Sequence, residues 1–307
     1  MMKNFVLRII LFFAIVFCLD FVFGIVMDYM SKNANSGDTK MLNSLCMDSN
    51  YDVLIMGSSR AHHHYDDMLL SDSLGLKVYN MGVDGNGIVL MNGLWKLLSQ
   101  RYTPKLIIYD VEPAFDLMVY KEDDANRRYL SKLKPYFHTP CVDSIFHFVS
   151  PLEEIKNHSV FFRYNTDFFN VIKNYVSYSQ VPRFGYAPIQ GVMTDGEKRP
   201  IITESIKTDD VKISFLRNLV VDVRSKGGQI IFIASPKYHV SSSEVYQPLR
   251  KICEEYKVPF WDYYNDSTFQ KSEYFKEPMH LNKKGAEVFS NYIVNKIKEY
   301  YANSSPI

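Results

Sequence analysis

The chain has no excess of either charge, few cysteines and none of the common nucleotide-binding or metal-binding motifs. Lys and Arg number 35 against 34 Asp and Glu, so no global field attracts nucleic acid, and nucleic-acid binding is not expected. The four cysteines form no CxxC pair, which excludes a disulfide framework but leaves one bridge open. No phosphate-binding loop, dinucleotide fingerprint or zinc spacing is present, so the sequence implies no cofactor and no metal.

One long apolar run is present, from Phe5 to Met27. A helix needs about 20 apolar residues to cross a bilayer, and the positive charges of Lys3 and Arg8 favour a cytoplasmic N-terminus. Residues 1–28 are therefore predicted to be a cytoplasmic tip and transmembrane anchor, with the rest outside the cytoplasm (periplasmic or at the cell surface). A signal peptide, cleaved to release a secreted protein, is the alternative.

The remainder reads as a polar linker over 29–50 and then short apolar runs that alternate with helical patterns. The predicted strands cover residues 53–56, 77–80, 105–110, 229–234 and 258–261. Strands that alternate with helices form a parallel sheet with helices on both faces. We therefore expect an α/β domain over 51–307, with a flavodoxin-like three-layer α/β/α sandwich.

Residues 114–204 interrupt this rhythm with many aromatic residues, broken by Pro135, Pro140, Pro151 and Pro182. A stretch of this length is too long for a loop in a compact domain. It predicts a mostly helical insertion lying over the edge of the sheet. Because buried aromatic side chains usually serve packing, we expect them to form a small core of their own; a platform for stacking a ligand is the alternative.

Three polar residues fall where a hydrolytic site needs them. Ser59 ends the sequence Gly57-Ser58-Ser59, where the first strand turns into a helix, although serine there is also a common helix cap. His280 follows the last strand, and Glu277 lies one turn before it. Ester chemistry requires a nucleophile, a base and a group that orients the base. We predict Ser59 as nucleophile, His280 as general base and then acid, and Glu277 as the orienting carboxylate.

The residues that follow Ser59 invite a metal assignment, because His62, His63 and His64 are consecutive. Successive residues of a helix point about 100° apart, so the three cannot all face one ion, and zinc is not expected. Instead, Arg60 and His63 are predicted to line the cleft beside Ser59.

These segments resemble the SGNH (GDSL-like) hydrolase superfamily, over most of residues 51–300 apart from the insertion. The first family block, Gly-Ser-Ser after a strand, matches residues 57–59, and the second resembles Asn80-Met81-Gly82-Val83-Asp84-Gly85. The last block, Asp-x-x-His before a helix that contains glycine, resembles residues 277–285 with Glu in place of Asp. The resemblance implies the flavodoxin-like fold and an oxyanion hole formed by the N–H groups of Ser59 and Gly85.

One block departs from the family pattern. The third strand should lead to an Asn that completes the oxyanion hole, but the chain reads Asp110-Val111-Glu112-Pro113. The hole then keeps two donors or borrows the side chain of Asn80 or Asn86, two residues that are also predicted to contact the substrate. Membrane-anchored SGNH proteins of cell-envelope acylation, such as the alginate O-acetyltransferases and the teichoic-acid D-alanylation protein, often diverge at this block, and the layout here resembles theirs.

The resemblance implies an extracytoplasmic serine esterase or O-acyltransferase. It would add or remove acyl groups, acetyl above all, on a cell-envelope polysaccharide through an acyl-serine intermediate. The alternative is a catalytically weak SGNH-like module that binds a glycan or a membrane acyltransferase partner. A plain structural domain would have no reactive serine.

Overall fold

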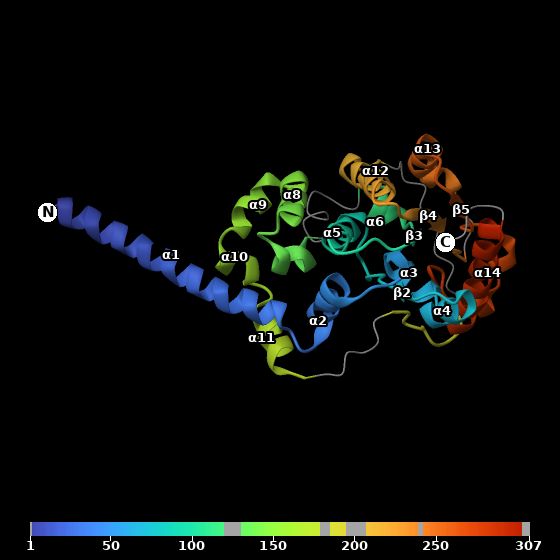
Figure 1. The fold of residues 1–307 in the computed structure, drawn as a ribbon, viewed down its shortest axis with the longest axis horizontal. Helices are drawn as coiled ribbons and strands as arrows, with labels where there is room; N and C mark the ends of the chain where they lie inside the picture. The colour runs from blue at the N-terminus through green and yellow to red at the C-terminus, as the bar shows by residue number, and fades with distance from the viewer. Residues whose placement is uncertain (1, 120–129, 179–184, 195–206, 239–241, 303–307) are drawn as a thin grey trace. The chain divides into compact units, whose positions relative to one another are not determined.

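The computed structural model describes residues 2–119, 130–178, 185–194, 207–238 and 242–302 (Figure 1). The chain divides into two compact units. One consists of Met1–Asp48 and Leu130–Pro182, and the other of Ser49–Tyr129 and Arg183–Ile307. We call them the helical unit and the sheet unit. This division differs from the predicted one, because much of the insertion joins the N-terminal segment; the parts of the insertion at 120–129, 179–184 and 195–204 lie outside the described residues.

The sheet unit is built on five parallel strands in the order β2-β1-β3-β4-β5. The strands are β1 (Val53–Gly57), β2 (Val78–Asn80), β3 (Leu106–Asp110), β4 (Gln229–Ala234) and β5 (Phe260–Asp262). Every residue of β1 and β3 is buried. This explains their apolar runs Val53–Met56 and Leu106–Tyr109, since both faces of a parallel sheet are covered. The predicted α/β class and parallel sheet are confirmed.

Helices cover both faces of this sheet. Alternate residues of β1, including Val53 and Ile55, share a core with Phe289 and Ile293 from α14 (Lys283–Ala302), which also contacts α3 (Ser59–His64) and α4 (Asp67–Leu74). The intervening residues point to the other face, where α5 (Ile88–Leu98) contacts β1 and α12 (Asp210–Ser225) contacts β4. The sheet unit is completed by the short elements α6 (Pro113–Asp116), η3 (Ser243–Tyr246), α13 (Gln247–Tyr256), η4 (Ser267–Phe269), η5 (Ser272–Tyr274), β6 (Phe275–Glu277) and β7 (His280–Leu281).

The helical unit contains α1, a single helix from Met2 to Lys32. The other elements are α2 (Gly37–Asn43), η1 (Ser44–Asp48), η2 (Ser131–Tyr136), α8 (Pro140–Val149), α9 (Pro151–Asn157), α10 (Val160–Tyr164) and α11 (Phe168–Val176). Proline occupies the first position of α8 and α9, where its missing N–H is not needed.

The predicted linker over 29–50 is largely helical, because the end of α1 and the whole of α2 and η1 lie in it. Its Asn43 accepts a hydrogen bond from the hydroxyl of Tyr136 at 2.7 Å.

The core of the helical unit joins α1 to the insertion. Met27 is buried together with Val160, Tyr164 and Val171. Aromatic residues of the insertion thus form a core, as expected, but they share it with the N-terminal helix instead of closing it among themselves. All four cysteines are free.

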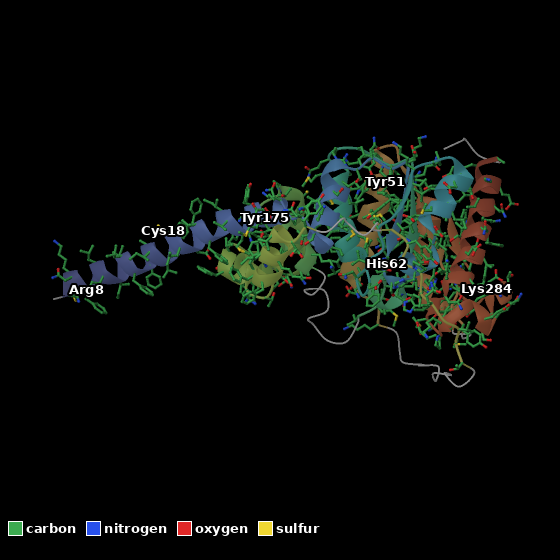
Figure 2. All side chains as sticks on the ribbon, turned by 90° about the horizontal axis from the view of Figure 1, so that it is seen from below. Arg8, Cys18, Tyr51, His62, Tyr175 and Lys284 are labelled. Carbon is green, nitrogen blue, oxygen red and sulfur yellow. The ribbon has the colours of Figure 1, made fainter. Side chains whose placement is uncertain are left out.

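The N-terminal part of α1 extends away from the other helices of its unit, as Figure 1 shows and as the side chains around Arg8 and Cys18 show in Figure 2. By length and composition, α1 could cross a membrane, and a signal sequence would pass the same test. The structure therefore supports an apolar N-terminal helix that is either a membrane anchor or a signal sequence.

Candidate active site

Ser59 is placed by a sharp turn at the carboxyl end of β1. Gly57 has a φ of +140°, and a Cβ on it would lie 2.4 Å from the Asp110 carbonyl oxygen of the neighbouring strand. Only glycine fits both conditions. Ser58 then precedes α3 as its N-cap without capping it through its side chain, and Ser59 is the first helical residue. Ser59, the predicted nucleophile, therefore lies at the sheet edge, beside the amides of a helix start.

His280 and Glu277 face each other across the small antiparallel hairpin of β6 and β7. His280 Nε2 lies 2.8 Å from Ser59 Oγ, and its Nδ1 contacts Glu277 Oε1. The other carboxylate oxygen of Glu277 accepts a hydrogen bond from the Met279 N–H at 2.9 Å. With Nδ1–H donated to the carboxylate, Nε2 is free to take the serine proton. The three residues predicted as catalytic are thus brought together in one hydrogen-bonded chain.

His64, which the sequence did not single out, holds this hairpin against α3. Its imidazole is buried, accepts a hydrogen bond from the Leu281 N–H at 3.0 Å through Nε2, and contacts Ser235 Oγ at 2.9 Å through Nδ1. Burial, and then the nearby His280 and Arg60, lower the pKa of His64 well below its usual value. A neutral His64 therefore positions the backbone next to His280.

Arg60 lies in the interior and does not line a cleft. Its guanidinium is 1% exposed, with Nε 2.8 Å from a Glu112 carboxylate oxygen and Nη2 3.6 Å from Asp110. Burial opposes the charge, but Glu112, Tyr246 and Asp110 raise the pKa of Arg60 well above its usual value. Arg60 therefore has no surface for a substrate, and Glu112, left open by the sequence, is its ion-pair partner. The substrate-contact prediction for Arg60 is corrected accordingly.

Asn80 is likewise a structural residue. Its side chain is buried and donates hydrogen bonds to the carbonyls of Ala61 at 2.6 Å and Tyr65 at 2.9 Å. Its Oδ1 accepts from the Gly82 N–H at 3.0 Å. Because both parts of the amide are used to join the loop to α3, Asn80 cannot replace the missing oxyanion-hole Asn without breaking this bracing, and its predicted role at the substrate is corrected.

The loop after β2 brings the other predicted residues to the surface near α3. Gly85 has a φ of +66°, which glycine adopts without strain, and the side chain of Asn86 donates to the Asp84 carbonyl at 2.9 Å. Gly82 lies against α3, since a Cβ there would be 2.4 Å from the His62 nitrogen. The loop therefore packs beside α3, while the donor roles of Ser59 and Gly85 stay predictions.

His63 lies next to the triad, with its ring centroid 5.6 Å from that of His280. Its Nδ1 contacts the Ala187 carbonyl at 2.7 Å, and its Nε2 lies 3.3 Å from Asp84 Oδ1. Although burial disfavours a charged imidazole, the hydrogen bonds with Asp84 and Ala187 raise the pKa of His63. His63 is thus the predicted substrate-contact residue that the structure places beside His280.

Asp84 also joins His62 to this group, with Nδ1 2.9 Å from the same carboxylate oxygen. Hydrogen bonds from His62 and His63 lower the pKa of Asp84. Ligand atoms of His62, His63 and Asp84 lie within 4.8 Å of one another, so these three are the described residues that could hold a cation. Without a cation, the contacts of His62 and His63 with Asp84 also hold the three side chains together. The Ser59–His280–Glu277 chain needs no metal.

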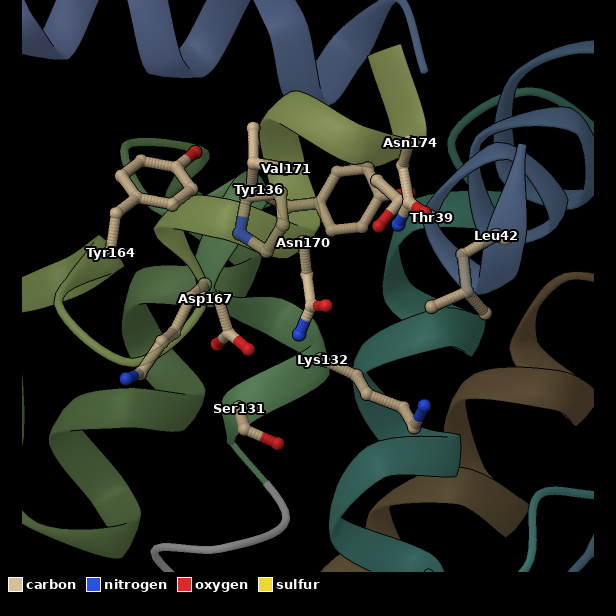
Figure 3. Close-up of a pocket in the computed structure, with 13 residues that line it drawn as sticks. Thr39, Leu42, Ser131, Lys132, Tyr136, Tyr164, Asp167, Asn170, Val171 and Asn174 are labelled. Carbon is tan, nitrogen blue, oxygen red and sulfur yellow. The ribbon is translucent and has the colours of Figure 1, made fainter. Parts of the chain in front are cut away.

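A separate cavity of about 400 Å³ lies in the helical unit (Figure 3). It is lined by residues of α2, η2 and α11, among them Lys132, Asp167, Asn170 and Asn174. Apolar side chains such as Leu42 and Val171 line it as well, and it contains none of Ser59, His280 and Glu277. Comparison of the whole chain with known protein families and with curated proteins finds no match.

Proposed function

We propose that the chain is a serine esterase or O-acyltransferase of the SGNH type. The observation that carries the proposal is the Ser59 Oγ–His280 Nε2 distance of 2.8 Å with Glu277 on the opposite ring nitrogen. The strand order β2-β1-β3-β4-β5 supports it, since flavodoxin-like sheets have this order and bind ligands at the carboxyl ends of their strands. Ser59 follows the carboxyl end of β1.

The proposed reaction has two half-steps. Ser59 Oγ attacks the carbonyl carbon of an acyl ester while its proton moves to His280 Nε2. The bond from the acyl carbon to the leaving sugar oxygen then breaks, and that oxygen takes the proton from His280. Water in an esterase, or a sugar hydroxyl in a transferase, reverses these steps and releases the acyl group from Ser59. The amides of Ser59 and Gly85 are the proposed donors to the oxyanion.

The proposed substrate is an acylated cell-envelope polysaccharide, acetylated above all, outside the cytoplasm. Lys3 and Arg8 at the start of α1 support an inserted helix with a cytoplasmic N-terminus. Anchoring is favoured over signal cleavage because Phe23 and Met27 of α1 pack in the core of the helical unit. Cleavage near the end of the apolar run would remove them from the folded protein.

A second candidate is a weakly catalytic module that binds a glycan or a membrane acyltransferase partner. It is favoured by the missing Asn after β3, where Glu112 is buried against Arg60, and by the amides of Asn80 and Asn86, which already bond to backbone carbonyls. Loss of one oxyanion donor typically slows catalysis about a hundredfold or more.

The test uses the full chain in detergent, since α1 is part of the folded protein. A fluorophosphonate probe should add to the wild type, as measured by intact mass, and not to Ser59→Ala. Ser58→Ala is the matched control, because that hydroxyl is buried and has no hydrogen-bond partner among the residues that the structure describes. Aryl acetate turnover that rises with a sugar acceptor would indicate transfer. Absence of labelling and turnover from mildly acid to alkaline pH would contradict an enzyme and leave the binding module.

A further inference from the structure

The apolar helix α1 carries a carboxylate, and the insertion satisfies it. Asp20 accepts hydrogen bonds from the N–H groups of Val160 at 3.0 Å and Phe161 at 2.8 Å. It also accepts one from the Ser159 hydroxyl at 3.2 Å. These donors form the first turn of α10, so Asp20 caps a helix that lies 140 residues further along the chain. A charge that is costly in an isolated apolar helix is thereby given partners.

The contact continues along α1 toward its C-terminal end. At Gly24, a Cβ would lie 2.7 Å from a methyl group of Val160, so glycine allows α10 to approach the helix closely. Asp28 then pairs with Arg163 at 3.1 Å and accepts from the Tyr164 hydroxyl at 2.7 Å. From Asp20 onward, α1 is therefore one wall of the helical unit.

Aromatic side chains surround α1 at the level where this contact begins. Phe23 stacks on Phe161 with ring centroids 4.6 Å apart and on Phe168 at 5.7 Å, and Phe168 meets Phe169 edge-on at 5.2 Å. We call these four residues the aromatic collar. Phe161 is 48% and Phe169 82% exposed, which is unusual for large apolar side chains that serve only a core.

The exposed part of the collar is continuous with the apolar surface of α1. Phe21 and Val22, which flank the contact region, are also exposed. Beside the collar, the ammonium groups of Lys134 and Lys156 lie within 6 Å of the Phe162 ring centroid, at 5.9 and 5.5 Å. Aromatic rings with adjacent cations are typical of protein surfaces at the boundary between lipid chains and headgroups.

We propose that α10 and α11 lie at the outer surface of the membrane and that the aromatic collar inserts into its interface. The inference rests on the proposed anchoring by α1. The apolar stretch of α1 from Phe5 to the collar residue Phe23 is about 28 Å long at 1.5 Å per residue, close to the ~30 Å hydrocarbon thickness of a bilayer. It leaves Lys3 on the cytoplasmic side, with the long side chain of Arg8 able to reach the headgroups there. Asp20 then lies at the end of the hydrocarbon region, where α10 supplies its partners.

The test places a tryptophan in the collar. The full chain with Phe169→Trp is reconstituted into phosphatidylcholine–phosphatidylglycerol vesicles whose chains carry bromine either near the headgroup or near the chain end. Both native tryptophans, Trp95 and Trp261, belong to the sheet unit, so wild-type fluorescence is subtracted. Phe13→Trp in the exposed middle of α1 is the positive control, and Tyr292→Trp in α14 is the matched surface control.

The emission of Phe169→Trp should shift to shorter wavelength and be quenched most by bromine near the headgroup. Phe13→Trp should be quenched most by bromine near the chain end. Tyr292→Trp should be quenched by neither. An emission like that of tryptophan in water would overturn the proposal. A blue shift without bromine quenching would also overturn it, because protein would then cover the collar. Vesicle flotation and quenching of Phe13→Trp report the anchor separately, and serine labelling reports the active site.

Discussion

Replacing Arg60 by Met tests how far the buried charges beneath α3 stabilise the sheet unit. The guanidinium contacts two buried carboxylates, Glu112 and Asp110, and donates hydrogen bonds to the Val111 carbonyl at 2.5 Å and the Tyr246 hydroxyl at 3.1 Å. Methionine fills a similar space without charge or donors. The substitution therefore leaves two carboxylates in the interior without their cation.

The expected loss of stability follows from these two unpaired buried carboxylates. Removing one partner of a buried ion pair costs about 3–5 kcal/mol, and each buried acceptor left without a donor costs about 1–3 kcal/mol. These costs overlap because protonation of a carboxyl relieves part of them, so we expect Arg60→Met to lower the free energy of unfolding by about 3–5 kcal/mol. Arg217→Met is the control: its pair with Glu255 is solvent-exposed and should contribute at most about 1 kcal/mol.

Urea unfolding of the full chain in detergent, followed by tryptophan fluorescence, isolates this effect, because both tryptophans belong to the sheet unit. The double variant Arg60→Met with Glu112→Gln should recover part of the loss, since it removes one of the stranded charges. A loss for Arg60→Met no larger than that for Arg217→Met would refute the argument that this buried network holds the unit together.

Three further predictions concern Glu277, the histidine cluster and α1. Glu277→Gln removes the charge that fixes the tautomer of His280, so serine labelling should slow about a thousandfold or more; an unchanged rate would contradict the assigned role. The pKa of His63 is raised by its contact with Asp84 despite burial, so the stabilisation by this pair is complete below the unfolded pKa of about 6.5 and is lost as the pH rises through the folded value. The urea midpoint of wild type should thus exceed that of Asp84→Asn more at pH ~6 than at pH ~9, and a constant difference would contradict the linkage. Asp20→Ala removes the cap of α10 and should cost the helical unit about 0.5–2 kcal/mol, seen as faster amide exchange in α10 by mass spectrometry; unchanged exchange would show that the cap is unimportant.

The sequence predicted features that depend on local pattern. Each strand is a short run of apolar residues between turn signals, and the alternation with helices predicts that the strands lie parallel. Ser59 could be found because it follows the carboxyl end of β1, at the edge where parallel sheets bind ligands, and His280 because it lies in a polar segment after the last predicted strand, one turn beyond Glu277. That part of the site needs no knowledge of distant contacts.

The remaining features depend on contacts between distant segments, which no local pattern contains. A charged residue directly after a nucleophile suggests substrate binding, yet Arg60 is buried against Glu112 and Tyr246, far away in sequence. The sequence does not distinguish His64 from His62 and His63. Its contact with the Leu281 N–H in the structure does. The aromatic insertion indicated a core, but nothing in its spacing indicated that α1 would be part of that core.

The division of the chain also determines the order in which its parts can fold during synthesis. The hydrogen bond between Asp20 and Val160 cannot form until the 140 residues that separate them have been synthesised. Loop closure over such a distance is slow. By then β1, β2 and β3 have been made, whereas β4 and β5, beginning at Gln229, have not. The helical unit can therefore close while β3 still has an open edge, since β4 is its missing neighbour. An open edge strand recruits other chains, so the interval between synthesis of the insertion and of β4 is when the nascent protein is most prone to aggregate and most dependent on chaperones.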